Sequence, residues 1–532
     1  METVSQQRTT RCPTTIFIID STSQRFIQIG DHDKFTIKIT EPAKFEWAPN
    51  HLYLKVQKND FQYFAQAPKP DICQLQRISS SNFDLPLCTT SDTGQPGMRI
   101  AIIGAGIVGV TTAYELAADG HEVTVFERCS AVAEETSFAN AGIIAPGYVT
   151  PWSAPGVPTK VLRDLFSRHA SVRFSLPLTS HDVAWMWRWL KSCQVDAWRA
   201  NRTRMQRLAF YSRERLDHLA ETLGLEFDAS QGYLVLLRTA KDQQRAAAGL
   251  ALLRDAGVAA QEVNAEQVRQ LEPALNVDTP LQGGIHMPQD GVANCRQFAL
   301  LIKRHAQRLG VQFEFNTHVD RLNAARPGSI QITSTTSILP VTHQFDSLVV
   351  CAGVSSAALL RPLGINLPMT AVYGYSITAT IGEPLNAPRS AVMDERYKVA
   401  ISRLGNRVRV AGSAELGGSA ATKNPASLQT LYKVLQDWFP GAARLAGGAS
   451  LGGSVGAGMQ EWKGARPMMP DGPPMIGASG VPGVWLNVGH GSSGWALSCG
   501  SARVLADVVV GKAPDIDLNG LGIDRLYGPC PL

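Results

Sequence analysis

The clearest pattern in the chain is a short apolar run that passes through glycines into a helical repeat. Residues 100–103 read Ile-Ala-Ile-Ile, which is typical of a buried parallel strand. Apolar positions then recur with helical spacing over residues 107–118, and Gly120 marks the end of that helix. A second apolar run, residues 121–126, predicts the next strand. Together these stretches predict a β-α-β unit of a parallel sheet.

Three glycines, Gly104, Gly106 and Gly109, stand between the first strand and the helix in the spacing G-x-G-x-x-G. Gly104 permits the tight turn, Gly106 lets a pyrophosphate approach the backbone, and Gly109 lets the helix pack close to the strand. The first amides of the helix and its dipole favour the negative charge of phosphates. The spacing therefore favours a dinucleotide site over a chance packing turn.

An acidic residue stands where such a site needs one. Glu127 follows the second strand, 23 residues after Gly104, where a carboxylate accepts hydrogen bonds from a ribose hydroxyl and repels the 2′-phosphate of NADP. We therefore expect this β-α-β unit to hold the ADP half of the ligand. The residues concerned are Ile100, Ile102, Ile103, Gly104, Ala105, Gly106, Ile107, Val108, Gly109, Tyr114, Glu127 and Arg128.

The rest of the chain alternates helical and strand-like stretches. Helical periodicity extends over 181–224, 241–256, 295–309, 427–439 and 496–510. Strand-like runs occupy 232–238, 283–294, 311–316, 345–353 and 484–488. Three more, 372–380, 397–403 and 407–411, follow one another closely, which favours an antiparallel sheet distinct from the parallel one. The expected fold class is α/β, with a Rossmann-like domain and a second α+β domain.

The N-terminal residues 1–97 do not continue this pattern. Alternating runs at 35–40 and 51–56 are compatible with short strands, and residues 89–97 have the composition of a linker before Met98. Two interpretations compete, a small β-rich module and an upstream extension with no settled fold. We favour the extension, because of the linker and the methionine that opens the nucleotide strand.

Composition narrows the functional classes. The chain has 532 residues, 44% hydrophobic and 18% charged, with a net charge of +5, which predicts several globular domains and makes nucleic acid an improbable partner. Nine cysteines lack any CxxC pair, so we expect no metal site and free thiols in a reducing compartment. With no signal peptide and no spanning segment, the expected location is cytoplasmic. The arginines of 199–215 form either a solvated face or a peripheral contact with an anionic membrane.

Three stretches together resemble a known family. They are the Gly104 fingerprint, the run Arg-Pro-Met-Met-Pro-Asp-Gly-Pro from Arg466, and Gly-His-Gly-x-x-Gly-Trp from Gly489. The chain resembles FAD-dependent amine oxidoreductases of the D-amino acid oxidase type, and more narrowly the small-subunit family of bacterial D-amino acid dehydrogenases. Further matching stretches lie at 135–142, 146–158, 374–376 and 394–398. Tyr373 departs from the lysine expected before Gly-Tyr-Ser, and the Gly-rich run 444–460 is longer than expected.

The resemblance implies a domain division and a reaction. The FAD-binding domain would comprise 98–180, 281–360 and 461–515, and the substrate domain 181–280 and 361–460. FAD would take a hydride from the α-carbon of a D-amino acid, the imino acid would hydrolyse to a 2-oxo acid and ammonia, and electrons would pass to a quinone or another non-oxygen acceptor. Alternatives are an oxidase that uses O₂, a related amine such as D-hydroxyproline or an N-methyl amino acid, a non-catalytic FAD subunit, and an NAD-dependent dehydrogenase.

The resemblance also assigns roles to single residues. It adds Ser137, Asn140, Gly142, Val319 and Gly353 to the residues that hold FAD, and it places the loop of Gly489, Gly491 and Ser492, at a helix N-terminus, beside the negative end of the reduced flavin. We expect Arg466, with Arg403 as second choice, to bind the substrate carboxylate. Tyr375 and Tyr397 would supply hydroxyls. His490 is either a site residue or a structural histidine. Hydride transfer from a neutral amine needs no protein base, so we assign none.

Overall fold

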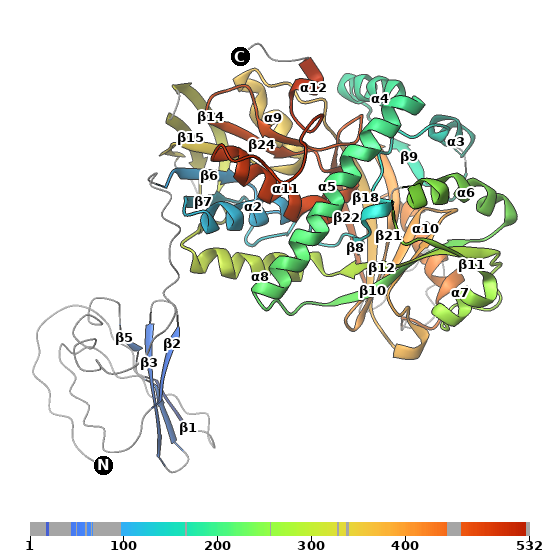
Figure 1. Ribbon diagram of the computed structural model, residues 1–532, viewed down its shortest axis with the longest axis horizontal. Helices are drawn as coiled ribbons and strands as arrows, with labels where there is room; N and C mark the ends of the chain where they lie inside the picture. The colour runs from blue at the N-terminus through green and yellow to red at the C-terminus, as the bar shows by residue number, and fades with distance from the viewer. Residues whose placement is uncertain are drawn as a thin grey trace, which may run out of the picture. The chain divides into compact units, whose positions relative to one another are not determined.

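The computed structural model describes residues 97–164, 167–255, 257–326, 329–336, 340–443 and 459–527, together with five short strands nearer the N-terminus (Figure 1). The chain divides into two compact units, Met1–Thr93 and Gly94–Leu532. Within the described parts, no helix combines the length and the apolar character that crossing a bilayer requires.

The first unit contains a small antiparallel sheet. Its strands are β1 (Phe17–Asp20), β2 (Lys44–Ala48), β3 (His51–Lys58), β4 (Phe61–Phe64) and β5 (Gln66–Ala67). They pair in the order β1-β4-β3-β2, with β5 also on β3. The strand expected at 51–56 is therefore confirmed as β3, and the one expected at 35–40 lies outside the described residues. These pairings are of the kind that the β-rich alternative expects, and the extension with no settled fold, which we favoured, stays a prediction.

The second unit is built on two large sheets. The first has six strands, β6 (Arg99–Ile103), β7 (Glu122–Phe126), β13 (Gln312–Glu314), β17 (Ser347–Val350), β23 (Met475–Ala478) and β24 (Val484–Val488). Their order is β13-β7-β6-β17-β24-β23, and all neighbours are parallel except β23 and β24. Helix α2 (Ile107–Ala118) follows β6 as the periodicity predicts. The Rossmann-like arrangement is thus confirmed.

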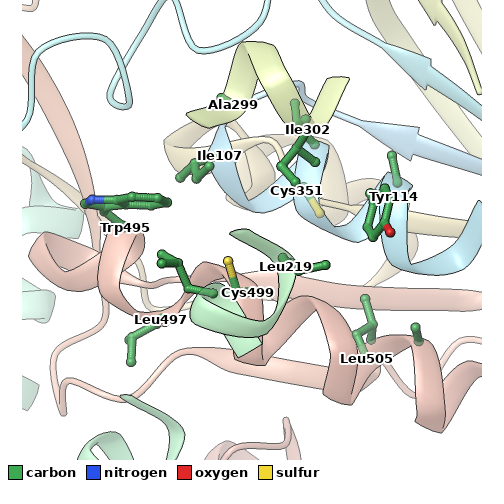
Figure 2. Packing of buried hydrophobic residues seen from close by; sticks show 14 of the residues in the cluster. Ile107, Tyr114, Leu219, Ala299, Ile302, Cys351, Trp495, Leu497, Cys499 and Leu505 are labelled. Atoms are coloured by element: carbon green, nitrogen blue, oxygen red, sulfur yellow. The ribbon is translucent and has the colours of Figure 1, made fainter. Parts of the chain in front are cut away.

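Four helices pack together on one face of this sheet (Figure 2). They are α2, α5 (Val195–Thr222), α8 (Cys295–Arg308) and α11 (Gly494–Val509). Leu116, Leu208, Phe298 and Leu505 are fully buried between them. At the centre, buried Glu115 of α2 pairs with Arg215 of α5 at 2.7 Å and with Arg503 of α11 at 2.9 Å. Helix α5 therefore belongs to the nucleotide-binding core, although we assigned residues 181–280 to the substrate domain.

The opposite face of the six-stranded sheet is covered by a smaller sheet of β14 (His318–Arg326), β15 (Ser329–Thr335) and β16 (Pro340–Phe345). Apolar side chains such as Leu322, Ile330 and Ile332 pack there against Ile103 and Val350. The short helices α9 (Ser356–Leu360) and α12 (Asp524–Tyr527) lie at the same side of the fold (Figure 1). The parallel strands are consequently buried on both faces, which explains their almost continuous apolar sequences.

The second large sheet has ten strands. They are β8 (Ile143–Ile144), β9 (Val172–Ser175), β10 (Ala229–Leu237), β11 (Gln261–Asn264), β12 (Gly283–Ala293), β18 (Thr370–Thr380), β19 (Ala391–Asp394), β20 (Val399–Leu404), β21 (Arg407–Gly417) and β22 (Met459–Met468). The main order is β11-β12-β10-β19-β20-β21-β18-β22, with β8 on β12 and β9 on β21. Most neighbours are antiparallel, as expected, but β10 pairs with β19, and β9 with β21, in parallel.

Helices α7 (Ala265–Leu271) and α10 (Pro425–Trp438) bury one face of the ten-stranded sheet, and α6 (Ala240–Asp255) packs against β10 and β12. Strands β12 and β22 belong to this sheet, although our predicted FAD-binding ranges, 281–360 and 461–515, contain all of β12 and most of β22. A short connection from Met468 leads β22 directly to β23 of the other sheet. The remaining helices, α3 (Val157–Asp164) and α4 (Ser180–Ser192), precede α5.

Candidate active site

A cavity of about 1590 Å³ is lined by both large sheets of the second unit. One part is formed by the turn after β6 and by residues that follow β7 and β17. Another is formed by β18, β21 and β22, and the loop before α11 completes the lining. The carboxyl ends of parallel strands are the usual place for a ligand in such a sheet.

The glycine turn has the geometry that the sequence predicts. Gly104 has φ of +100°, and a Cβ there would lie 2.6 Å from the carbonyl oxygen of Cys351. A Cβ on Gly109 would lie 1.9 Å from the carbonyl oxygen of Gly104, so the helix packs against the turn at a distance that only glycine allows. A Cβ on Gly106 would meet only the Ser137 hydroxyl, at 3.5 Å, and Gly106 faces the cavity. The backbone at Gly106 is therefore open to a phosphate.

Two polar side chains hold this turn in place. Glu127, buried at 9% exposure, accepts hydrogen bonds from the N–H groups of Ala105 (2.6 Å) and Cys129 (2.8 Å). The Ser137 hydroxyl accepts a hydrogen bond from the N–H of Ile107 (3.1 Å) and so caps the first turn of α2. Both residues also line the cavity. A carboxylate oxygen accepts more than one hydrogen bond, so Glu127 retains capacity for a ribose hydroxyl.

Most residues that we expected to hold the cofactor do line the cavity. They are Ile103, Gly104, Gly106, Ile107, Val108, Glu127, Arg128, Ser137, Asn140, Gly142, Val319, Gly353, Gly489, Gly491 and Ser492. Five others do not, because they lie behind the turn or in the helical core: Ile100, Ile102, Ala105, Gly109 and Tyr114. Figure 2 shows Tyr114 among the packed side chains of α2 and its neighbours. The contact that we expected from these five is corrected to a supporting role.

The loop before α11 brings a second helix end to the cavity. Gly489, Gly491 and Ser492 line it, and Gly489 and Gly491 have φ of +79° and +58°. His490 is buried, and its Nε2 lies 3.1 Å from the Ser501 hydroxyl of α11. Burial lowers the pKa of His490 to about 3, so the ring is neutral near neutral pH. His490 also lines the cavity, and its contact with Ser501 anchors the loop, so both alternatives that the sequence left open stay predictions.

Arg466, on β22, lines the cavity without an acidic partner. Its Nη1 donates to the carbonyl oxygen of Ser413 at 2.9 Å, and no ion pair within the described residues includes it. Burial lowers the pKa of Arg466 to about 10, still well above neutrality. A guanidinium that is desolvated and lacks a carboxylate is poised to bind an anion.

The other sequence-predicted substrate residues have different surroundings. Tyr375 lines the cavity, but its hydroxyl donates to Glu415 and accepts from the N–H of Asn424 (3.0 Å). Arg403 and Tyr397 do not line the cavity. Arg403 donates to the carbonyl of Pro384 (3.3 Å), and the ring of Tyr397 lies against Arg238. Arg403 on β20 and Tyr397 in the turn before it thus lie outside the cavity that we expected them to line.

The sequence analysis assigned no role to several charged residues that line the cavity, and Lys463 is the one beside Tyr373 and Tyr375. Lys463 of β22 is buried and pairs with Glu415 at 2.8 Å, and it also donates to the carbonyls of Ser419 and Thr422. Its ammonium lies 4.3 Å from the centroid of the Tyr373 ring. No signal in the sequence distinguishes this lysine from an exposed one, since its partners come from β21 and the loop after it. Because three acceptors hold its ammonium group, the Lys463 side chain has a fixed position in the cavity wall.

A Rossmann-like sheet, a glycine turn with an acid behind it, and a large cavity lined by an arginine without an acidic partner are the features of a dinucleotide-dependent oxidoreductase. Residues 99–508 match the profile of the family described as FAD dependent oxidoreductase. The chain belongs to that family, and FAD is its cofactor. The open backbone at Gly106 and the two helix ends at the cavity fit the phosphates and the flavin of FAD.

Curated relatives agree with this assignment. The chain is 43% identical over 438 residues to a protein named D-amino acid dehydrogenase from Cereibacter sphaeroides. The aligned region covers 81% of this chain and 96% of that protein. A protein of the same name from Bradyrhizobium diazoefficiens is 40% identical over 430 residues, covering 80% and 99%.

Solved structures share the fold at low sequence identity. Glycine oxidase from Geobacillus kaustophilus superposes with a TM-score of 0.62 at 21% identity, covering 80% of this chain and 99% of that one. L-proline dehydrogenase from P. horikoshii gives 0.58 at 16% identity, covering 81% and 98%. These likenesses confirm the combination of a Rossmann-like domain with a second sheet.

Proposed function

We propose that this protein oxidises D-amino acids to 2-oxo acids and ammonia. The names of relatives at 40–43% identity support the substrate class. The observation that carries the proposal is the unpaired guanidinium of Arg466 in the cavity, because every amino acid offers it a carboxylate. Bound FAD supplies the hydride acceptor for the α-carbon, and the imino acid that leaves is hydrolysed by water.

The chain's own residues then have separate tasks. The turn at Gly106 and the first turn of α2 hold the pyrophosphate, with Glu127 at the adenosine ribose. Arg466 orients the substrate by its carboxylate, so that the α-carbon has a fixed position relative to the cofactor. The loop at Gly489 and Gly491 presents the N-terminal end of α11 to the flavin, where backbone amides stabilise negative charge.

Anaerobic bleaching of the flavin tests this proposal. Purified holoenzyme is mixed with D-alanine, L-alanine, D-hydroxyproline and an N-methyl amino acid, and the visible flavin absorbance is followed. We expect D-alanine to bleach the flavin and L-alanine to leave it unchanged. Bleaching by an N-methyl substrate or D-hydroxyproline alone would select the related-amine alternative. A flavin that no amine reduces would indicate a non-catalytic FAD subunit.

We further propose that the electron acceptor is a quinone, reached at an apolar rim of the cavity. The rim consists of cavity-lining apolar side chains from α3, β9 and α4 that are exposed: Leu162, Phe174, Val183, Trp187 and Leu190. Leu162 and Trp187 are 72% and 60% exposed. Clustered apolar side chains at a cavity mouth are typical of a docking surface. Arg188 and Lys191 are exposed and adjoin Trp187 and Leu190 in α4, and such cations attract the anionic surface of a membrane.

A comparison of acceptors tests the rim. We expect reduced holoenzyme to reduce a short-chain ubiquinone faster than O₂, and Trp187→Ser with Leu190→Ser to slow the quinone reaction but not the bleaching by D-alanine. Leu385→Ser is the matched control, because Leu385 is 84% exposed and does not line the cavity. Binding of the wild type, and not of the rim variant, to anionic vesicles would support a peripheral membrane contact. Rapid reduction of O₂ with peroxide formation would instead indicate an oxidase.

A further inference from the structure

The guanidinium of Arg466 contacts two residues, Gly374 and Ser413, at which the pairing of strands β18 and β21 is irregular. Strand β18 pairs with β21 through Tyr373 opposite Glu415 and then through Tyr375 opposite Gly412. One residue lies between these two positions on β18, but two residues lie between them on β21. Ser413 and Ala414 therefore both stand opposite the single residue Gly374, which is a β-bulge. Bulges of this kind redirect the backbone locally, and this one lies in the cavity wall.

Ser413 has a backbone conformation that is unusual for a strand. Its φ is +54°, in the left-handed region that side chains other than glycine and asparagine rarely adopt. In that conformation its carbonyl oxygen accepts the hydrogen bond from Arg466 at 2.9 Å. Four non-glycine residues of the described ranges have positive φ, and three of them, Ala133, Lys398 and Ser413, line the cavity. Strained backbone gathers at functional sites, where the surrounding structure maintains it.

The hydroxyl of Ser413 does not explain this conformation. It is buried and has no hydrogen-bond partner within the described residues. The contribution of Ser413 to Arg466 is therefore made by its main chain, and the φ angle, more than the side chain, determines where the carbonyl points.

Gly374 is a second residue in close contact with the guanidinium of Arg466. A Cβ built on Gly374 would lie 2.3 Å from Nη2 of Arg466 and 2.5 Å from its central carbon. The guanidinium thus packs directly over the Cα of Gly374, in the space that any other residue would fill. Strand pairing places Gly374 two residues from Val372, the direct partner of Arg466 across β18 and β22.

We propose that the bulge of Gly374 and Ser413 is a positioning device for Arg466. The Ser413 carbonyl oxygen accepts a hydrogen bond from one N–H of the guanidinium, and the guanidinium plane lies against the backbone of Gly374. The other N–H groups of Arg466 then face the substrate carboxylate in a single orientation. Because a guanidinium recognises a carboxylate through a rigid planar fork, fixing the plane fixes the substrate. Ser413 and Gly374 are positioning residues that act through Arg466, and the inference rests on the proposed role of Arg466 in binding substrate.

The experiment uses the conformational preference at position 413. Valine is β-branched and strongly disfavours positive φ, whereas glycine and asparagine accept it. In the holoenzyme we expect Ser413→Val to raise KM for D-alanine, and the inhibition constant of benzoate, about tenfold, with kcat changed less. Ser413→Gly and Ser413→Asn should each recover most of that loss, although neither keeps the hydroxyl. Gly374→Ala should resemble Ser413→Val.

The control is Ser376→Val. Ser376 of β18 is also buried, its hydroxyl also lacks a hydrogen-bond partner among the described residues, but it has no positive φ and does not line the cavity. Flavin absorbance and thermal unfolding of each variant establish that it is folded and loaded with FAD. If Ser413→Val does not fold, Gly374→Ala and Ser413→Gly decide the question.

Two results would overturn the inference. One is a loss in Ser413→Gly as large as that in Ser413→Val, which would assign the effect to the hydroxyl. The other is an unchanged benzoate inhibition constant in both Ser413→Val and Gly374→Ala. Arg466→Met separates this failure from that of the proposed function: if it too leaves benzoate binding unchanged, Arg466 does not bind the carboxylate at all.

Discussion

The carboxylate of Glu127 accepts a hydrogen bond from the backbone N–H of Ala105, with 2.6 Å between oxygen and nitrogen. This bond joins the end of β7 to the glycine turn that begins α2. The acidic residue of the fingerprint, which the sequence assigns to the ribose, therefore also fixes the shape of the turn beneath the pyrophosphate.

Replacement of Glu127 should consequently affect both FAD and the turn. We expect Glu127→Ala to raise the dissociation constant of FAD about 10- to 100-fold, since a charged acceptor of several hydrogen bonds is lost. FAD retained after dialysis measures the effect. Glu122→Ala, at the exposed start of β7, is the control. Full retention in Glu127→Ala would contradict both roles.

Removal of the Arg466 charge should weaken substrate binding selectively. We expect Arg466→Met to raise KM for D-alanine about 100-fold, because a bidentate, charge-assisted contact is lost, while FAD stays bound. Steady-state kinetics and the flavin spectrum report the two effects. Arg403→Met should leave KM near the wild-type value, since Arg403 lies outside the cavity. An equal rise of KM in Arg466→Met and Arg403→Met would contradict the prediction, because the effect would then not be specific to the arginine in the cavity.

A single methyl group at Gly109 should destabilise the nucleotide-binding core. Its Cβ would lie 1.9 Å from the Gly104 carbonyl oxygen, a backbone atom that cannot move without opening the turn. We expect Gly109→Ala to lower the free energy of unfolding by more than about 2 kcal/mol, measured by denaturant titration. Gly249→Ala in α6 has open space around it and should be neutral or stabilising by up to about 1 kcal/mol. A harmless Gly109→Ala would refute the close packing of α2 on the turn.

The buried carboxyl of Asp290 should make stability depend on pH. Burial raises the pKa of Asp290 to about 7, and its Oδ2 has no hydrogen-bond partner in the described part of the chain. An aspartate of the unfolded chain titrates near 3.9. Between these values the folded state binds the proton more tightly, so the contribution of Asp290 to the free energy of unfolding decreases as pH rises from about 4 to 7.

The asparagine variant tests this dependence. We expect Asp290→Asn to be more stable than the wild type at pH 8, by on the order of 1–3 kcal/mol, and to show little gain at pH 4.5. Denaturant unfolding at the two pH values gives the difference. Asp278→Asn on the surface should show no such trend. A gain of equal size at both pH values would assign the effect to packing and not to the charge of Asp290.

Much of the nucleotide-binding half follows from local sequence. The strand, the glycines, the helix and Glu127 are consecutive, and each obeys a rule that acts within a few residues, so β6, α2 and β7 were predicted almost to the residue. The sequence also predicted that Arg466 lies at the site, because the residue belongs to a long motif that resembles one of a known family.

The features that were missed depend on contacts between distant residues. Arg403 belongs to the ten-stranded sheet, but its place depends on the pairing of β20 with β19 and β21, and Tyr397 lies in the turn between β19 and β20. Lys463 becomes a cavity residue through Glu415, almost fifty positions earlier. The predicted domain ranges were limited for the same reason, since β12 and α5 contain no local signal of the sheet or core that they join. Strand pairing and helix packing thus supply what periodicity does not.

The short connection between β22 and β23 limits how this protein can be redesigned. The strand that carries Arg466 ends at Met468, and Met475 already belongs to the sheet that holds the nucleotide. A block exchanged between homologues with its junction in this connection would separate the strand that carries Arg466 from the sheet that holds the nucleotide. A new substrate range is therefore better sought by point substitutions at Tyr373 and other cavity-lining side chains that do not hold Arg466 than by grafting a whole half of the fold.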